Sequence, residues 1–277
     1  MFNFLKRPRL GLALGGGGAR ALAHIGVLKV LEREGIKPDV LAGTSMGGII
    51  ALAYANGASA ADLEKEALKM ASFRRLVRLV DGFPPRRGLI AGAKLKQYFI
   101  DDIGLGTTFD DLQIPCTVCA VDLERAECVA LNSGSVVDAA LATSAVPGLF
   151  PPVLIEGRRL VDGGLLNNVP VNLLEESSAR HTLAVDVSFL LSPDQAQTPR
   201  ESLPFLPPFT VDAINAIIVM TTAITRSRLE EYPPDVLIHP HLPAEIGILT
   251  GFTHASEIID MGLHAAQESL EEISRLM

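Results

Sequence analysis

Short apolar runs alternate along the chain with longer amphipathic segments, without internal repeats. The apolar runs are typical of buried strands, and the longer segments repeat apolar residues at helical spacing. Strands are predicted at 9–14, 40–42, 116–121, 128–131, 158–161 and 182–187. Helices are predicted at 21–34, from 43–47 to about 55, from 59 to about 72, at 136–143 and at 254–276. This alternation predicts an α/β sandwich with a mostly parallel central sheet and helices on both faces.

The 277 residues are expected to form one domain, 1–277, although the length lies just above the range in which a single core grows. Its motif-bearing core covers about 10–187, and 211–276 adds a C-terminal strand and helices. The proline-rich segment 192–208 is interpreted as a surface loop. Hydrophobic residues make up 48% and charged residues 20%, which is typical of a globular chain and excludes low-complexity architectures.

The net charge of −8 disfavours nucleic acid as a partner, because a polyanion is repelled by such a field. Three cysteines give no disulfide framework, which fits a reducing compartment. Cys116 and Cys119 are predicted to be small buried side chains on opposite sides of a strand.

Two segments bear on membrane insertion. Only five apolar residues follow the basic residues near the start of the sequence, too few for a secretory signal. The uncharged stretch between Asp39 and Asp62 is interrupted by glycines and polar residues, so it is interpreted as a strand, a turn and a helix rather than a membrane span. A cytoplasmic protein is expected.

The stretch 43–47 reads G-x-S-x-G, with Ser45 at its centre, between an apolar strand and an apolar helix. In that setting the serine lies on a tight strand-to-helix turn. Gly43 and Gly47 leave room for the backbone that holds its Oγ out at the end of the sheet. The helix that follows points its positive end at the same place. The context favours a nucleophilic serine over a turn without chemistry.

A run of four glycines, 15–18, follows the first predicted strand. With Ala21 it fits the spacing G-x-G-x-x-A of a dinucleotide-binding turn, which also needs an acidic residue at the end of the second strand. That strand has its nearby aspartate, Asp39, at its start. The other interpretation is an anion cradle, in which exposed backbone N–H groups serve an acyl-transfer oxyanion. A non-catalytic or dinucleotide-binding α/β module is therefore the alternative to an enzyme.

The base that a nucleophilic serine needs is assigned to Asp162. It ends an apolar strand, and Gly163 and Gly164 after it let other backbone approach the carboxylate. A strand-end turn without chemistry is the alternative. None of the six histidines lies in a comparable turn, and too few strands precede the serine for the α/β-hydrolase order. His24 and His264 are assigned surface or packing roles.

Together these motifs resemble those of the bacterial patatin-like phospholipases, which are related to the plant storage lipase patatin and to the catalytic domain of neuropathy target esterase. The stretch 12–20 resembles the glycine-rich loop of the family, 43–47 its nucleophile elbow and 162–164 its aspartate motif. The resemblance spans about 10–187, since the following stretches are also similar: 21–28, 143–152 and 165–170. Ala21 stands where the family usually has glycine.

The resemblance implies a serine esterase that hydrolyses carboxylic esters of phospholipids or lysophospholipids with a Ser-Asp dyad and no histidine. Ser45 attacks the ester, and Asp162 takes its proton. The oxyanion is bound by the N–H groups of Gly17 and Gly18, with Gly16 as a further donor. The supporting residues of the motifs are Gly15, Arg20, Gly43, Gly47, Gly163 and Gly164. No metal and no cofactor is implied.

The role of Arg20 is open between steadying the glycine loop, meeting a substrate phosphate, and lying on a helix surface. A second open question concerns the segment 73–96, where seven basic residues accompany one acidic residue. It is interpreted either as a peripheral membrane contact or as an ordinary helix with a solvated basic face. Phe205, Leu206 and Phe209 are candidates for a lid or an acyl-chain wall.

Overall fold

A central eight-stranded sheet organises the protein, whose computed structural model describes residues 10–71, 92–101, 104–177, 179–189 and 208–277. The strand order is β5-β6-β3-β2-β1-β7-β8, with β4 paired beside β3. The parallel strands are β1 (Leu10–Leu14), β2 (Val40–Thr44), β3 (Cys116–Asp122), β7 (His181–Val185) and β8 (Val236–Ile238). The antiparallel strands are β4 (Glu127–Leu131), β5 (Val153–Ile155) and β6 (Arg158–Asp162). The predicted mostly parallel sheet is confirmed.

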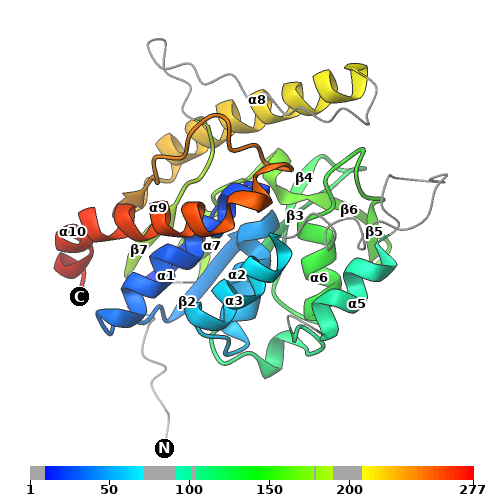
Figure 1. The fold of residues 1–277 in the computed structure, drawn as a ribbon. Helices are drawn as coiled ribbons and strands as arrows, with labels where there is room; N and C mark the ends of the chain where they lie inside the picture. The colour runs from blue at the N-terminus through cyan, green and yellow to red at the C-terminus, as the bar shows by residue number, and fades with distance from the viewer. Residues whose placement is uncertain (1–9, 72–91, 102–103, 178, 190–207) are drawn as a thin grey trace, which may run out of the picture.

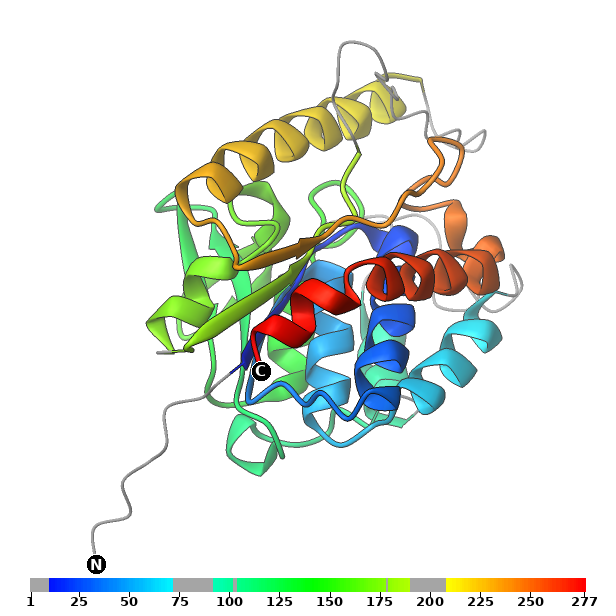
Figure 2. The same cartoon turned by 90° about the vertical axis from the view of Figure 1, so that its left-hand side faces the viewer.

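Helices cover both faces of this sheet, as predicted (Figure 1). One face carries α1 (Ala23–Arg33), α2 (Ser45–Ala55), α3 (Ala60–Met70), α5 (Ala93–Asp101), α6 (Val136–Thr143), α9 (Ala255–Glu268) and α10 (Leu270–Arg275). The other carries α7 (Val171–Glu176) and the C-terminal end of α8 (Pro208–Glu231). In Figure 2, α8 is the yellow helix at the top of the view, on the outside of the molecule. Short 3₁₀ turns lie at Gly18–Leu22, Phe109–Asp111, Gly163–Leu165 and Gly251–His254.

Alternation along the strands divides the core into two layers, because successive side chains point to opposite faces. Leu12, Leu14 and Leu41 pack under α1, α2 and α9. Ala13 and Ala42 point the other way and pack against α7.

The predicted elements differ from the observed ones mainly at their ends. The closing helix 254–276 is broken at Ser269 into α9 and α10, and β7 ends at Val185 instead of 187. Of the proline-rich segment, 192–207 lies outside the described residues, and Pro208 begins α8, where a proline without an N–H is well tolerated.

Cys116 and Cys119 are buried free thiols that pack on opposite faces of the sheet, as predicted. Among the described residues, no helix is both long and apolar enough to cross a membrane.

Candidate active site

Ser45 lies directly at the turn from β2 into α2, of which it is the first residue. Its φ of +53° falls in the left-handed region, which a non-glycine residue rarely adopts and which is typical of a constrained functional turn. A Cβ at Gly47 would lie 2.4 Å from the carbonyl oxygens of Leu14 and Gly15. Only glycine therefore lets the first turn of α2 pack against the end of β1, and the predicted strand-turn-helix around Ser45 is confirmed.

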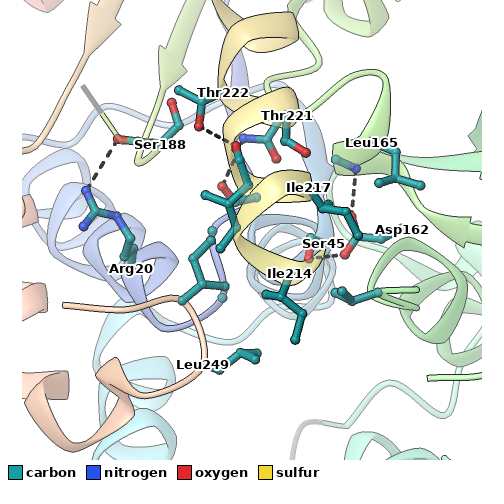
Figure 3. Close-up of a pocket in the computed structure, with 18 of the residues that line it drawn as sticks. Arg20, Ser45, Asp162, Leu165, Ser188, Ile214, Ile217, Thr221, Thr222 and Leu249 are labelled. Atoms are coloured by element: carbon teal, nitrogen blue, oxygen red, sulfur yellow. Dashed lines mark hydrogen bonds between the residues drawn. The ribbon is translucent and has the colours of Figure 1, made fainter. Parts of the chain in front are cut away.

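Asp162 is hydrogen-bonded directly to this serine, although 117 residues separate the two in the sequence. Ser45 Oγ donates to Asp162 Oδ2 at 2.7 Å, and the N–H of Gly164 donates to Asp162 Oδ1 at 2.8 Å (Figure 3). Asp162 reaches this position because β6 pairs with β3, which in turn pairs with β2. Both carboxylate oxygens are thus held, and one of them faces the serine hydroxyl.

Asp162 is 6% exposed as a residue, and the burial of its carboxyl raises its pKa to about 6, because a charged carboxylate loses solvation. The hydrogen bonds from Ser45 and Gly164 favour the charged form and oppose the rise. A carboxylate whose pKa lies nearer to neutrality is a better general base than an exposed one.

The pH dependence of ester hydrolysis should report this carboxyl. Below its pKa of about 6, Asp162 holds a proton and cannot accept one from Ser45, so kcat/KM is expected to fall as the pH is lowered through 6. The measurement is a pH profile with a soluble nitrophenyl ester. A profile that stays flat between pH 5 and 7 would contradict the assignment of Asp162 as the base.

The glycine loop after β1 lies beside the serine and lines the same cavity. The N–H of Gly15 donates to Val185 O at 3.0 Å, and that of Gly16 donates to Asn168 O at 3.1 Å. Within the described chain, the N–H groups of Gly17 and Gly18 have no protein acceptor. The loop therefore offers two consecutive N–H donors in the cavity that Ser45 also lines.

The close approach of the segment around Ile248 explains the last glycine of the loop. Gly18 has a φ of +54°, and a Cβ there would lie 2.3 Å from Ile248 O. The following N–H, of Ala19, donates to the same carbonyl at 2.8 Å. Ala21, at the position where a glycine is usual in the resemblance, is fully buried in the 3₁₀ turn.

Arg20 is 2% exposed, so its interpretation as a helix-surface residue is wrong. Its guanidinium lies 4.1 Å from the centre of the Phe189 ring. The guanidinium donates to five carbonyl oxygens beyond the glycine loop, those of Val187, Ser188, Leu242, Pro243 and Ile246, at 2.8–3.5 Å. Arg20 thereby ties the turn after the glycine loop to the segment that follows β7 and to 242–246.

The glycine loop is held by two polar side chains, Asn168 and His24, which local sequence patterns do not single out as functional. Asn168 Nδ2 donates to Gly16 O at 3.2 Å, and the backbone of Asn168 accepts from the same residue. His24 Nε2 bonds to Gly15 O at 2.7 Å, and complete burial lowers the pKa of His24 to about 4, so the neutral ring donates this bond. The signal available in the sequence was the Asn-Asn pair after the aspartate motif.

None of the six histidines bonds to Ser45 or Asp162: within the described residues, the side chains of this pair bond to each other and to the N–H of Gly164. His24 packs inside the fold and His264 is exposed, in line with the packing and surface roles expected. His181, His239 and His254 lie beside Asp235, Asp186 and Glu257, and His241 is exposed. Within the ranges that the structure describes, no cluster of three His, Cys, Asp or Glu residues is arranged to hold a metal.

An apolar cavity opens beside the pair, with about 770 Å³ between its walls, counting the open mouth. One wall is α8, which Figure 3 shows passing in front of the serine and aspartate. The lining from α8 consists of Ile214, Ile217, Ile218, Thr221 and Thr222, and further walls come from Val146, Pro147, Leu149, Phe189 and Leu249. The sequence signal for α8 was the helical spacing of its isoleucines.

Some of the predictions fall where the structure gives little or no description. Phe205, Leu206 and 73–91 of the basic segment lie outside the described residues, and Phe209 is placed only as part of the first turn of α8. Of the basic segment, Lys94 and Lys96 are described, both in α5, and Lys96 Nζ donates to Asp138 at 2.7 Å.

Fold and site together define an α/β protein with a serine at a strand-to-helix turn, bonded to a buried aspartate beside a glycine loop. The sequence profile of the family described as patatin-like phospholipase matches residues 12–174, which contain all three motifs. The chain belongs to the patatin-like phospholipase family, which confirms the resemblance.

Known proteins similar to the chain come from several organisms. An NTE family protein of Mycobacterium tuberculosis is 32% identical over 217 residues, 78% of this chain and 58% of that protein. The lysophospholipase nte1 of Aspergillus fumigatus is 34% identical over 189 residues, 64% of this chain and 12% of that protein. The crystal structure of VipD from Legionella pneumophila aligns with a TM-score of 0.45 and 14% identity, covering 91% of this chain and 66% of VipD. The chain spans little more than half the length of the mycobacterial relative.

Proposed function

We propose that this protein is a lipid acyl hydrolase that cleaves the carboxylic ester of a phospholipid or lysophospholipid with a Ser45–Asp162 dyad. The observation that carries the proposal is the 2.7 Å hydrogen bond from the Ser45 hydroxyl to the buried carboxylate of Asp162, in the lining of an apolar cavity. Membership of the patatin-like phospholipase family and the lysophospholipase name of a fungal relative support it.

The reaction proceeds in two halves. In the first, Ser45 Oγ attacks the ester carbonyl carbon while its proton passes to Asp162 Oδ2, and the tetrahedral intermediate then expels the alcohol, which takes the proton from Asp162. In the second, a water molecule attacks the acyl-enzyme and gives a proton to Asp162. Collapse releases the fatty acid, and Asp162 returns the proton to Ser45.

The oxyanion of each intermediate accepts hydrogen bonds from the N–H groups of Gly17 and Gly18 in this proposal. Both line the cavity that Ser45 also lines, and neither has an acceptor in the described part of the protein. The N–H of Gly16 is engaged by Asn168 O, so we assign that glycine to holding the loop. Fixed backbone donors of this kind stabilise charge as it develops, without reorganisation.

The acyl chain of the substrate occupies the cavity along α8 in this proposal. Isoleucines at three positions of α8, together with Leu149 and Phe189, give walls that exclude water from a hydrocarbon chain. Arg20 lines the cavity but directs its guanidinium to five protein carbonyls. We therefore assign Arg20 to steadying the loop and not to binding a substrate phosphate.

The dinucleotide-binding alternative needs an acidic side chain at the carboxyl end of β2, beside the glycine loop. That end carries Thr44 and Ser45. Asp39 precedes β2, where its carboxylate accepts from the N–H of Leu10 at 3.0 Å, at the opposite end of the strand. The geometry supports the hydrolase over this alternative.

Fatty-acid release from lysophosphatidylcholines of increasing acyl length tests the function and the acyl cavity together. Wild type is expected to prefer long chains. Replacing Ile217, which points into the cavity, with tryptophan should shift the preference to shorter chains, with at least about a 10-fold loss on the longest, because each methylene that no longer fits forfeits its burial.

The matched control is Val219→Trp, two residues along the same helix but 42% exposed and outside the cavity lining. It should keep the wild-type length profile. Absence of turnover for every chain length, in a folded wild-type protein, would contradict the proposed function. An unchanged profile for Ile217→Trp would contradict only the placement of the acyl chain.

A further inference from the structure

The segment 143–145, at the C-terminal end of α6, contacts both members of the dyad. Thr143 Oγ1 accepts a hydrogen bond from the backbone N–H of Ser45 at 3.0 Å. Two residues further on, Ala145 O accepts from the backbone N–H of Asp162 at 3.1 Å. Thr143 and Ala145 therefore hold the backbone of the nucleophile on one side and that of the base on the other, while the Ser144 side chain between them bonds back to α6.

The Thr143 hydroxyl has a defined direction. It donates to Cys119 O, in β3, at 2.5 Å, and because a carbonyl only accepts, the single hydroxyl proton lies on that side. A lone pair is thereby turned toward the Ser45 N–H. Thr143 has no exposed surface, so water does not replace either bond.

Ser45 needs such a partner because its N–H belongs to the amino end of α2, where backbone donors have no acceptor within the helix. Its left-handed φ of +53° is also a conformation that persists only when the surroundings enforce it. The bond to Thr143 supplies an acceptor and fixes the peptide that carries the Ser45 side chain.

The Cys119 carbonyl contacts the residues that hold both members of the dyad. On one side it accepts from Thr143. On the other, the backbone of Gly163, next to Asp162, packs so closely that a Cβ there would lie 2.2 Å from the same oxygen. Movement of Thr143 relative to β3 would therefore change the position of Ser45 relative to Asp162.

We propose that Thr143 is a positioning residue for the hydrolysis, whose hydroxyl sets the geometry between Ser45 Oγ and Asp162 by joining the Ser45 peptide to the β3 carbonyl of Cys119. This inference rests on the proposed function. Thr143 does not contact substrate; it acts through Ser45.

Thr143→Ser and Thr143→Ala form the matched pair for the test, because both remove the same methyl group and differ only in the hydroxyl. With a soluble nitrophenyl ester, Thr143→Ser is expected to stay within a few-fold of wild type. Thr143→Ala should lose about 10²-fold in kcat with KM nearly unchanged, the cost of a small misplacement of a reacting group. Thr143→Val, which keeps the size of the side chain, should behave like Thr143→Ala and replaces it if the alanine variant is unfolded.

A second readout separates positioning from a general loss of stability. The Ser45 hydrogen bond holds the pKa of Asp162 below the value that burial alone would give. If Ser45 Oγ moves away, that bond weakens, and the acid limb of kcat/KM should shift to higher pH in Thr143→Ala but not in Thr143→Ser. Ser144→Ala is the control, since Ser144 Oγ donates back to Ala140 O within α6 at 2.7 Å and does not bond to the dyad.

Equal kcat and equal pH profiles for the serine, alanine and valine variants would overturn the inference while leaving the proposed function intact. So would a loss of activity in Thr143→Ser as large as in Thr143→Ala, because the hydroxyl would then not be the cause. Hydrolysis that persists when Ser45 itself is replaced would instead overturn the proposed function, and this inference with it.

Discussion

Ser45→Ala is expected to abolish ester hydrolysis, by about 10⁶-fold or to below detection, while leaving the protein folded. Loss of a nucleophile removes the covalent route altogether, and only transition-state binding by the loop would persist. The fold should tolerate the change, because alanine at position 45 adopts the left-handed backbone conformation at a cost similar to that of serine. Without the hydrogen bond from Ser45, Asp162 is expected to stay protonated, which avoids the cost of a buried charge.

Initial rates with a short-chain nitrophenyl ester, together with thermal unfolding, measure this outcome. Ser144→Ala is again the matched control, since it removes a serine hydroxyl that bonds only within α6. It should retain wild-type rates. If Ser45→Ala retained turnover near the wild-type rate in purified protein, the enzyme assignment through this site would have to be abandoned.

The turn that carries Ser45 could be predicted from the sequence because its requirements are local. Gly43 and Gly47 lie within two residues of the serine, and the apolar strand and helix follow directly on either side. The 2.7 Å bond to Asp162 depends instead on the strand order β6-β3-β2. Strand order is set by packing between distant segments, which a local pattern does not encode, so the resemblance to a family supplied that pairing.

The elements for which local patterns gave no residue bounds, including the strand and first helix of the predicted C-terminal region 211–276, are short or lack polar contrast. β5 and β8 have three residues each, and α7 has six, too few to show a period. In α8 no charged residue lies between Asp212 and Arg226, so its inner and outer faces resemble one another in hydropathy. The single closing helix was predicted across Ser269, whose hydroxyl and N–H both bond to Ala265 O where α9 ends.

The burial of Arg20 likewise could not be predicted from local sequence. Nothing in the residues around Arg20 indicated that its side chain would be buried. Its acceptors lie between 167 and 226 residues away in the sequence, just after β7 and in 242–246. A buried guanidinium of this kind is stable only when folding brings several carbonyls together around it.

Asp162→Asn is expected to lower hydrolysis, and the rate of phosphonate labelling of Ser45, by about 10²–10⁴-fold, the usual worth of a general base. The amide has nearly the same shape as the carboxyl but places a hydrogen-bond donor where the carboxylate had an acceptor. If its oxygen accepts from the N–H of Gly164, as Asp162 Oδ1 does, its NH₂ group faces Ser45 Oγ and donates where the carboxylate accepted. The serine then has a hydrogen bond but no group that can take its proton.

The controls for Asp162→Asn are glutamine replacements of His181, His239, His241, His254 and His264, made one at a time. In the structure each of these histidines is either exposed or beside a carboxylate other than Asp162, so labelling of Ser45 should stay near the wild-type rate in all five. His24 is left out because its ring holds Gly15 O, and its loss would disturb the glycine loop by itself. If one of the five replacements silenced Ser45 in a folded protein while Asp162→Asn did not, the dyad would be wrong. A histidine relay of the α/β-hydrolase kind would then describe the site better.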